Sequence, residues 1–448
     1  MVPIRIKKGY TLNVEGRPSL DVEVLKTPAR VAAVPEKIPF IKPGLAVQVG
    51  DAVEIGSVLF VDKRNPGIKF LSPGCGTVEQ INFGPRRVIR EIVIKLDQEE
   101  SCKAFESVSE DSLEHLARER IIQLLTDGGL WPLIREFPFR DIAGPANIPP
   151  AIFVSLDAGE PFQPGSQVYL EGHQSLFAYG IRILRRLARD KVYVSARRDN
   201  PIVSGEYKQF ITHHYIGNYP ADDPGVLLYY LRKSTAENRA WYISGQDVLL
   251  MARLLKNGRY PVERIVTLAG SSVQKPRHVR TRLGVPLAHL AGSRNDGENT
   301  RHVVGGLFRG YPASKNDFLG FYETALTLLP EGRREEVLGF VRPGFTRPTY
   351  SRTFLSVFNT SALKMDCNRH GGIRACIACG YCAEVCPVDI LPQLTFKAVL
   401  ADEVEAYLAH GLLDCVECGL CTYVCPSKIE LKNILVKAKA AYYKELTA

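Results

Sequence analysis

The sequence predicts an α+β protein of several domains, in which β-rich modules and an α/β region precede an all-helical tail. Three observations support this prediction. Near the front, apolar and polar residues alternate between turn residues. In the middle, an apolar run is followed by a helical pattern and then by a second apolar run. Near the end, apolar residues recur with helical spacing. A length of 448 residues also fits about three or more domains. The expected boundaries are 1–100, 101–260, 261–325, a connecting segment over 326–365, and 366–448.

The front of the chain is predicted to be a β-rich module. Valines alternate with polar residues over residues 41–81, and turn residues such as Gly44 and Gly50 interrupt the run. The order V-x-V-G-D-x-V-x-x-G, followed by S-P-x-x-G-x-V, resembles the barrel-sandwich hybrid fold of biotinyl and lipoyl carriers. Such carriers modify a lysine at a hairpin tip. Neither Lys63 nor Lys69 has the flanking residues of a modified lysine, so we interpret the module as structural.

The middle of the chain is predicted to be a Rossmann-like α/β domain. Residues 150–157 have the composition of a buried strand, residues 173–190 that of an amphipathic helix, and residues 191–196 that of a second strand. The loop after the first strand, DAGEPFQPGSQ, lacks the G-x-G-x-x-G pattern of dinucleotide-binding domains. A second strand–helix pair, AWYIS and QDVLLMARLLKNG, follows. His213 and His214 lie in a strand-like segment and are interpreted as structural.

Residues 264–292 are predicted to form a second β module. The segment runs strand, turn, strand and short helix, with V-T-L-A-G followed by L-G-V-P-L. This order resembles the soluble-ligand-binding (SLBB-like) β-grasp modules of respiratory complexes.

The tail carries two copies of one cysteine motif, CIACGYCAEVCP and CVECGLCTYVCP. Each copy reads C-x2-C-x2-C-x3-C-P, the spacing with which dicluster ferredoxins hold two clusters, the fourth cysteine of each copy binding the other cluster. Zinc and free thiols are the alternatives, but zinc sites use paired C-x2-C units and four ligands. We therefore expect two [4Fe-4S] clusters, one on Cys376, Cys379, Cys382 and Cys425, the other on Cys415, Cys418, Cys421 and Cys386.

The remainder of the tail is predicted to be helical. Apolar residues such as Phe396, Leu400 and Val404 recur with helical spacing between the two motifs, and residues 431–446 continue that pattern after them. An all-helical dicluster ferredoxin domain is therefore expected, rather than a compact βαβ ferredoxin. Cys367, nine residues before the first motif, is interpreted as a packed cysteine, with a spare thiol near a cluster as the alternative.

Composition narrows the possible partners and compartments. The formal net charge of +9 suits an acidic protein partner or an anionic membrane surface, and no nucleic-acid-binding motif accompanies the basic runs. No apolar run approaches the ~18 residues of a membrane span, and the first residues lack the apolar region of a signal peptide. Clustered rather than scattered cysteines indicate metal binding in a reducing compartment. We expect a cytoplasmic protein with no nucleic-acid partner.

The order of these parts resembles two related families, RnfC of the Rnf ferredoxin:NAD⁺ oxidoreductase and NqrA of the Na⁺-translocating NADH:quinone reductase. The middle is similar to NqrA in GGLWPLIREFPF, ISGQDVLLMARLLKNGRY, IVTLAGSSVQKPRHVRT and PGFTRPTYSRTFLS. The tail is similar to RnfC in CPVDILPQLTF and GLLDCVECGLCTYVCPSKIEL. The resemblance implies an NqrA-like protein that carries an intact dicluster tail.

This resemblance implies a peripheral electron-transfer subunit of an ion-translocating Nqr- or Rnf-type complex, either an NADH:quinone or a ferredoxin:NAD⁺ oxidoreductase. The implied partners are membrane subunits, including flavin-bearing ones, at the cytoplasmic face of the inner membrane, and quinone is a candidate ligand. Two alternatives remain open. One is a stand-alone NADH- or quinone-binding oxidoreductase, and the other is a docking subunit whose clusters only stabilise the tail.

FMN and NADH are not expected on this chain. RnfC proteins and the flavin-bearing subunit of respiratory complex I share a glycine-rich loop of the kind G-x-G-G-A-G-F-P-T, whose uncovered N–H groups approach flavin phosphate and nicotinamide. The matching segment here, DGGLWPLIREFPF, keeps only Gly128 and Gly129. Pro132 removes a backbone donor, and Trp131 is expected to fill the space of a ligand.

Overall fold

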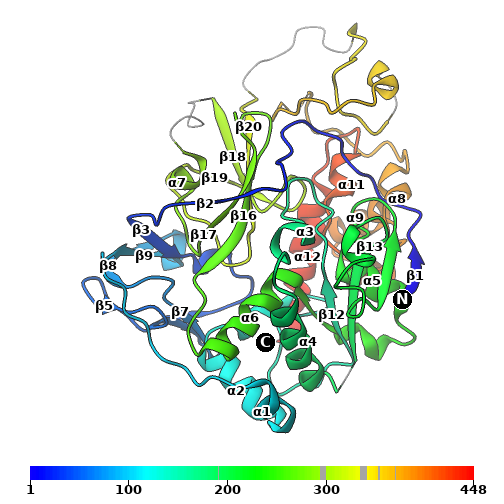
Figure 1. Ribbon diagram of the computed structural model, residues 1–448. Helices are drawn as coiled ribbons and strands as arrows, with labels where there is room; N and C mark the ends of the chain where they lie inside the picture. The colour runs from blue at the N-terminus through cyan, green and yellow to red at the C-terminus, as the bar shows by residue number, and fades with distance from the viewer. Residues whose placement is uncertain (190, 293–298, 333–340, 352–353, 369, 448) are drawn as a thin grey trace.

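The computed structural model describes residues 1–189, 191–292, 299–332, 341–351, 354–368 and 370–447. Within these residues the strands form four sheets, and the tail helices pack beside the largest of them (Figure 1). The predicted α+β multidomain fold is confirmed. Across the described parts of the chain, no helix combines the length and the apolar character needed to cross a membrane.

The front module consists of two small antiparallel sheets that enclose a common core. The valine-rich alternation directs Val31, Ile92 and Ile94 inward, where they are fully buried. Phe60 and Phe70 stack in the same core with ring centroids 4.4 Å apart. The four-stranded sheet has the order β3 (Arg30–Ala33), β9 (Ile89–Leu96), β8 (Gly76–Phe83) and β5 (Ala52–Val53), and the three-stranded sheet has the order β4 (Pro43–Leu45), β6 (Val58–Asp62) and β7 (Asn65–Leu71).

The middle of the chain forms a seven-stranded sheet, parallel except at one edge. Its central strand, Ile152–Ser155, is buried along its whole length, which explains the continuous apolar run in the sequence there. The first strand of the chain pairs in parallel with His213–Ile216, so the N-terminus joins this sheet and not the front module. The strand order is β1 (Val2–Arg5), β14 (His213–Ile216), β13 (Val192–Arg197), β12 (Ile152–Ser155), β15 (Trp241–Ser244), β10 (Arg135–Glu136) and β11 (Asp141–Ile142).

The helices that accompany this sheet begin and end where local sequence dictates. In α6 (Gly245–Asn257), the hydroxyl of Ser244 accepts a hydrogen bond from the Asp247 N–H at the start, and Gly258 ends the helix with a left-handed φ of 61°. The helix of the predicted βαβ unit, α4, buries its apolar face, including Phe177 and Leu187. The helices before and around the sheet are α1 (Glu110–His115), α2 (Arg118–Asp127), α3 (Ser166–Tyr169), α4 (Gln174–Leu187), α5 (Pro224–Leu231) and α6 (Gly245–Asn257).

The β-grasp region forms a six-stranded sheet with one short helix beside it. Two of its strands, β16 (Glu263–Ala269) and β17 (Arg277–Arg282), are antiparallel neighbours, as the sequence predicts. Val22–Val24, from the front of the chain, pairs in parallel with β17 and completes the sheet. The strand order is β19 (Tyr311–Ala313), β18 (Thr300–Val304), β20 (Ala325–Pro330), β16 (Glu263–Ala269), β17 (Arg277–Arg282) and β2 (Val22–Val24), and the helix is α7 (Leu287–Ala291).

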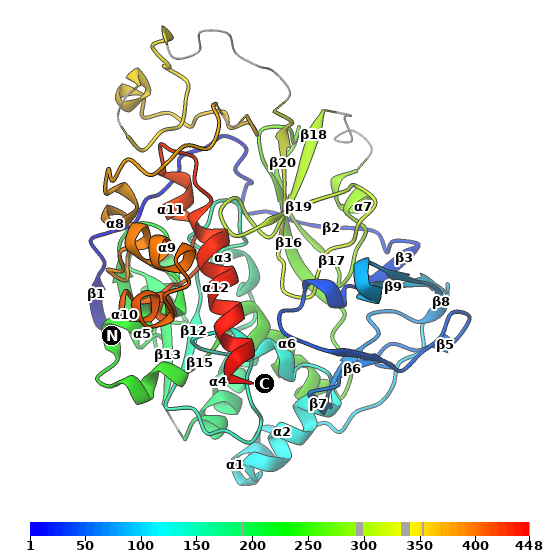
Figure 2. The same cartoon turned by 180° about the vertical axis from the view of Figure 1, so that it is seen from behind.

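The tail is helical, and it packs along the length of the molecule. The single helical pattern expected from Phe396 onward divides into two short helices, because Asp402 adopts a left-handed φ of 57° between them. The last helix crosses the view in Figure 2, with α8, α9 and α10 on one side and the front module on the other. The tail helices are α8 (Tyr381–Glu384), α9 (Pro392–Leu400), α10 (Val404–Ala409), α11 (Leu420–Tyr423) and α12 (Leu431–Leu446).

The C-terminal end of α12 joins the tail to the front module and to the α/β region. The Tyr443 hydroxyl donates to Asp141 Oδ2 at 2.6 Å, and its ring lies 4.6 Å from the rings of both Phe40 and Phe139.

The described 3-10 turns are η1 (Pro35–Lys37), η2 (Pro85–Arg87), η3 (Trp131–Leu133), η4 (Pro201–Val203), η5 (Thr235–Arg239), η8 (Leu355–Phe358) and η9 (Leu412–Asp414).

Candidate metal centre

The eight motif cysteines lie around two neighbouring cavities in the tail. Each cavity is lined by three cysteines of one motif and by the fourth cysteine of the other motif, and Cys382 reaches the wall of both. We call them the outer cavity, lined by Cys376, Cys379, Cys382 and Cys425, and the inner cavity, lined by Cys386, Cys415, Cys418 and Cys421. Among the described residues, no three His, Cys, Asp or Glu side chains approach closely enough to share a single metal ion.

The two motifs adopt matching backbone conformations. Ala378 and Glu417, which stand at equivalent places, are both left-handed with φ of 54° and 59°. Gly380 and Gly419 both have φ of 82° and both precede a one-turn helix, α8 and α11 respectively. Only glycine adopts this conformation at low cost, which accounts for the glycine after the second cysteine of each motif.

The inner cavity is covered by a buried network of charges from the α/β and β-grasp regions. Arg140 donates to both carboxylate oxygens of Asp223, at 2.8 and 2.9 Å, and to the carbonyl oxygen of Val416 at 3.0 Å. Arg309 donates to Asp223 Oδ2 at 2.5 Å. Burial pushes the pKa of the Asp223 carboxyl upward, but the two arginines outweigh it and hold that pKa below its ordinary value. The loop of the second motif around Val416, the inner loop, is therefore held by two arginines that one ionised carboxylate bridges.

Further hydrogen bonds hold the carbonyl groups of two cysteines that line the inner cavity. The Tyr219 hydroxyl donates to the Cys418 carbonyl at 2.8 Å, and Lys439 Nζ donates to the Cys415 carbonyl at 2.9 Å. Lys439 also pairs with Glu417 at 2.9 Å. Although burial alone would raise the pKa of Glu417, Lys439 and Arg140 lower it below its ordinary value. The inner loop is thus fixed on both sides by cations.

The inner thiols are suited to ligate a group that supplies positive charge. Burial raises the pKa of both Cys386 and Cys418 to about 12, and the backbone N–H groups of Val388 and Ile390 offset part of the rise at Cys386. Thiolates are the form that binds iron, so occupancy of this cavity requires the release of protons. N–H groups directed at cysteine sulfur are also among the features that set the potentials of iron–sulfur clusters. The residues present therefore fit a cluster.

The outer cavity lies at the surface. Cys379 is exposed, and the side chain of Ile377 is 67% exposed, whereas Val416 at the equivalent place of the second motif is only 4% exposed. The Cys382 thiol donates to Gln393 Oε1 at 3.2 Å, and the Ser427 hydroxyl donates to the Ala375 carbonyl at 2.8 Å. The outer loop is therefore tied to its own domain but open on one side.

The other residues considered from sequence lie outside both cavities. Cys75 is buried, with its sulfur 3.4 Å from Ser101 Oγ. Cys102 is exposed, and Cys367 is half-buried with its N–H donating to the Pro330 carbonyl at 3.1 Å. Of the two front-module lysines, Lys69 pairs with Asp127 at 2.7 Å, a structural contact. No local motif marks Arg140, Asp223 or Arg309 in the sequence, because their contacts with one another and with the tail join residues more than 80 positions apart.

Two features bear on the expectation that this chain binds neither FMN nor NADH. Trp131 is fully buried, its Nε1–H donates to the Ala143 carbonyl at 2.8 Å, and its ring meets Trp241 edge to face at 5.6 Å. In the loop after β12, Glu160 accepts hydrogen bonds from the backbone N–H groups of Phe308 at 2.6 Å and Arg309 at 2.8 Å. A β-grasp loop therefore covers the carboxyl end of the central strand, where ligands of open α/β sheets bind.

Comparison with known proteins matches four parts of the chain to family models. Residues 4–97 match the NqrA N-terminal barrel-sandwich hybrid domain, residues 116–260 the NqrA second alpha/beta domain, and residues 265–315 the NQRA C-terminal domain. Residues 375–429 match the 4Fe-4S dicluster domain.

Curated relatives extend this match over most of the chain. The NqrA protein of the Na⁺-translocating NADH-quinone reductase from Histophilus somni strain 2336 is 32% identical over 412 residues, which cover 92% of each chain. The NqrA protein of Pasteurella multocida is 34% identical over 413 residues, again with 92% of each chain covered. The chain belongs to the NqrA family. The predicted resemblance is confirmed for this family, and this NqrA chain also carries a dicluster domain at its tail.

A comparison with one solved structure shows only a weak likeness. A crystal structure of an NAD⁺-reducing [NiFe]-hydrogenase aligns with a TM-score of 0.34 and 15% identity over 52% of each chain, which is too low to bear on the fold or the function.

Proposed function

We propose that this NqrA chain is a peripheral electron-transfer subunit of an ion-translocating NADH:quinone oxidoreductase of the Nqr type, and that it carries electrons through two [4Fe-4S] clusters. The observation that supports this proposal most directly is the grouping of the eight cysteines around two adjacent cavities, with one cysteine exchanged between the motifs. Iron–sulfur clusters supply one-electron transfer. Two cluster sites side by side would give a path through the tail.

In this proposal Cys376, Cys379, Cys382 and Cys425 hold the outer cluster, and Cys386, Cys415, Cys418 and Cys421 hold the inner one. The chain has three tasks toward these clusters. Its thiols bind them, its backbone N–H groups and cations set their surroundings, and its apolar residues exclude water from the inner cavity. The exposure of Cys379 and Ile377 makes the outer site the place where a partner exchanges electrons with the chain.

Iron content and ligand exchange test this assignment together. Anaerobically purified protein should contain about eight irons per chain, since each site holds a four-iron cluster. Cys386→Ser should remove the inner cluster, although Cys386 belongs to the first motif, and Cys425→Ser should remove the outer cluster. Electron paramagnetic resonance of the reduced variants distinguishes the two losses. Cys102→Ser, at an exposed cysteine outside both cavities, is the control and should keep full iron.

Iron near four per chain, or stoichiometric zinc, would contradict the two-cluster proposal. Loss of the cluster of its own motif on replacing Cys386 would contradict the crossed ligand sets. Clusters that bind but do not change oxidation state in a redox titration would indicate a docking subunit whose clusters are structural.

FMN and NADH remain unexpected ligands of this chain. The burial and hydrogen bonding of Trp131, and the β-grasp loop that meets Glu160, support this expectation. Equilibrium dialysis of the purified protein with each ligand should show no stoichiometric binding at micromolar concentration. Tight binding of either one would favour a stand-alone NADH-binding oxidoreductase.

The membrane subunits of the complex, including its flavin-bearing ones, are the partners in this proposal, at the cytoplasmic face of the inner membrane. In its native host the protein should sediment with membranes and co-purify with those subunits, and the chain expressed alone should not sediment. Recovery of the native protein wholly outside any complex would contradict the subunit role.

A further inference from the structure

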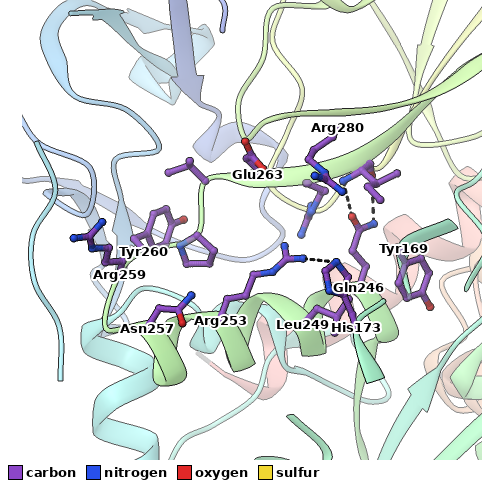
Figure 3. A pocket seen from close by; sticks show the side chains of 14 residues that line it. Tyr169, His173, Gln246, Leu249, Arg253, Asn257, Arg259, Tyr260, Glu263 and Arg280 are labelled. Carbon is purple, nitrogen blue, oxygen red and sulfur yellow. Dashed lines mark hydrogen bonds between the residues drawn. The ribbon is translucent and has the colours of Figure 1, made fainter. Parts of the chain in front are cut away.

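A cavity of about 320 Å³ lies between the α/β region and the β-grasp sheet, and none of its lining residues belongs to the tail (Figure 3). Helix α6 forms one wall, and the strands β16 and β17 with the loop before them form the opposite wall. His173, which precedes α4, closes one end. Neither the proposed clusters nor the family assignment gives this cavity a role.

The cavity collects positive charge from three directions. Arg253 comes from α6, Arg259 from the loop after it, and Arg280 from β17, with Glu263 as the one carboxylate among the described lining residues. In the described parts of the chain, no carboxylate forms an ion pair with Arg253, Arg259 or Arg280. A fourth lining arginine, Arg264, is paired with Asp247 at 2.5 Å.

The contacts at the centre of the cavity compensate this charge only in part, through the attraction between Arg253 and Glu263. Arg253 Nη2 donates to His173 Nε2 at 3.1 Å, as the dashed line in Figure 3 shows, so its partner is a neutral ring nitrogen. Burial, and then the neighbouring Arg253 and Arg280, lower the pKa of His173 below its ordinary value. Burial and Arg280 also lower the pKa of Arg253. Two neighbouring cations that destabilise each other are stabilised by an anion placed between them.

We propose that this cavity binds a small molecule, smaller than FMN or NADH, that carries a phosphate or pyrophosphate group. The guanidinium groups of Arg253 and Arg280, which come from separate elements, suit a group with many oxygens, because each planar fork can donate two parallel hydrogen bonds to it. The volume lies at the lower end of the range for small-ligand pockets and far exceeds the ~30 Å³ share of one water molecule. Leu249, Tyr260 and Val262 line the remainder of the cavity and provide apolar contact for the body of such a molecule.

Titration calorimetry at constant ionic strength tests this proposal with inorganic pyrophosphate and glycerol 3-phosphate as probes. The full chain should bind one of them with one saturable site. Arg253→Gln and Arg280→Gln should each weaken that binding at least about tenfold. Arg185→Gln, on the exposed face of α4 outside the cavity, is the matched control and should leave the affinity unchanged.

Two sources of the phosphate group can be separated by sedimentation with vesicles. Vesicles of phosphatidylcholine alone are compared with vesicles that also contain phosphatidic acid. Binding that requires phosphatidic acid and depends on Arg280 would assign the site to a lipid headgroup, and binding of the soluble probes would assign it to a free phosphate ester.

Absence of binding in both formats, or equal weakening by Arg185→Gln, would overturn the proposal. Arg280 is exposed, so its variant tests the site even where Arg253→Gln does not fold. The result is independent of iron content and thus of the electron-transfer proposal.

Discussion

The inner and outer cysteine loops have the same motif and nearly the same backbone, yet they meet different surroundings. Val416 in the inner loop is 4% exposed, and its carbonyl accepts hydrogen bonds from Arg140 and Arg309. The equivalent Ile377 in the outer loop is 67% exposed. The motif therefore determines the local geometry of the ligands, and the neighbouring domains determine which site is shielded.

The glycines that follow the second cysteine of each motif show the same difference. A methyl group at Gly419 would lie 2.6 Å from the carbonyl oxygen of Phe308, whereas a methyl group at Gly380 would meet no atom within 4 Å. Both positions need glycine for the left-handed backbone, but only the inner one also needs it for close contact with the β-grasp loop. The inner loop is therefore part of a domain interface, and the outer loop is not.

The largest expected effect comes from breaking the buried charge network on the inner side. Arg140→Met should lower the free energy of unfolding of the tail by about 4 kcal/mol, because it leaves the buried Asp223 with one arginine partner fewer. Arg374→Met, at an exposed arginine beside the outer loop, should change it by less than about 0.5 kcal/mol. Urea unfolding followed by the visible absorbance of the clusters measures both. Equal effects would remove the contrast between the two loops.

A smaller difference is expected between the paired glycines. Gly380→Ala should cost about 1 kcal/mol, the penalty for a left-handed backbone with a side chain. Gly419→Ala should cost about 3 kcal/mol, because the added methyl group also displaces the Phe308 backbone. The same urea measurement applies. A Gly380 variant as unstable as the Gly419 variant would mean that backbone strain alone, without domain contact, governs both sites.

The smallest contrast concerns the apolar side chains of the two loops. Val416→Ala should destabilise the tail by about 2 kcal/mol, because two buried methyl groups are lost. Ile377→Ala should change stability by less than about 0.5 kcal/mol, but it should slow electron exchange with partner subunits if the outer loop is the contact surface. Stopped-flow measurement of the reduction of this chain's clusters by the purified partner subunits gives that rate. An unchanged rate would place the partner contact elsewhere on the chain.

Much of the architecture was predictable, because its causes are local. The alternation in the front, the apolar run at Ile152–Ser155 and the helical pattern of Leu431–Leu446 each produced the expected element. The pairings of Val2–Arg5 and Val22–Val24 could not be predicted, since they join the N-terminus to strands about 200 and 250 residues away, and no sequence period encodes such a contact. The predicted domain boundaries remain predictions, and these two strands belong to sheets outside the front module.

For the candidate site, the sequence alone determined which thiols can act as ligands, because the C-x2-C-x2-C-x3-C-P spacing sets how closely a short chain can bring them together. It also determined the glycines, because their left-handed φ follows from the turn itself. Only the tertiary structure decided that Arg140, Asp223 and Arg309 cover one loop and leave the other open. The burial of a charge, and therefore its pKa and its energetic contribution, depends on what other segments pack around it, and that arrangement exists only in the folded molecule.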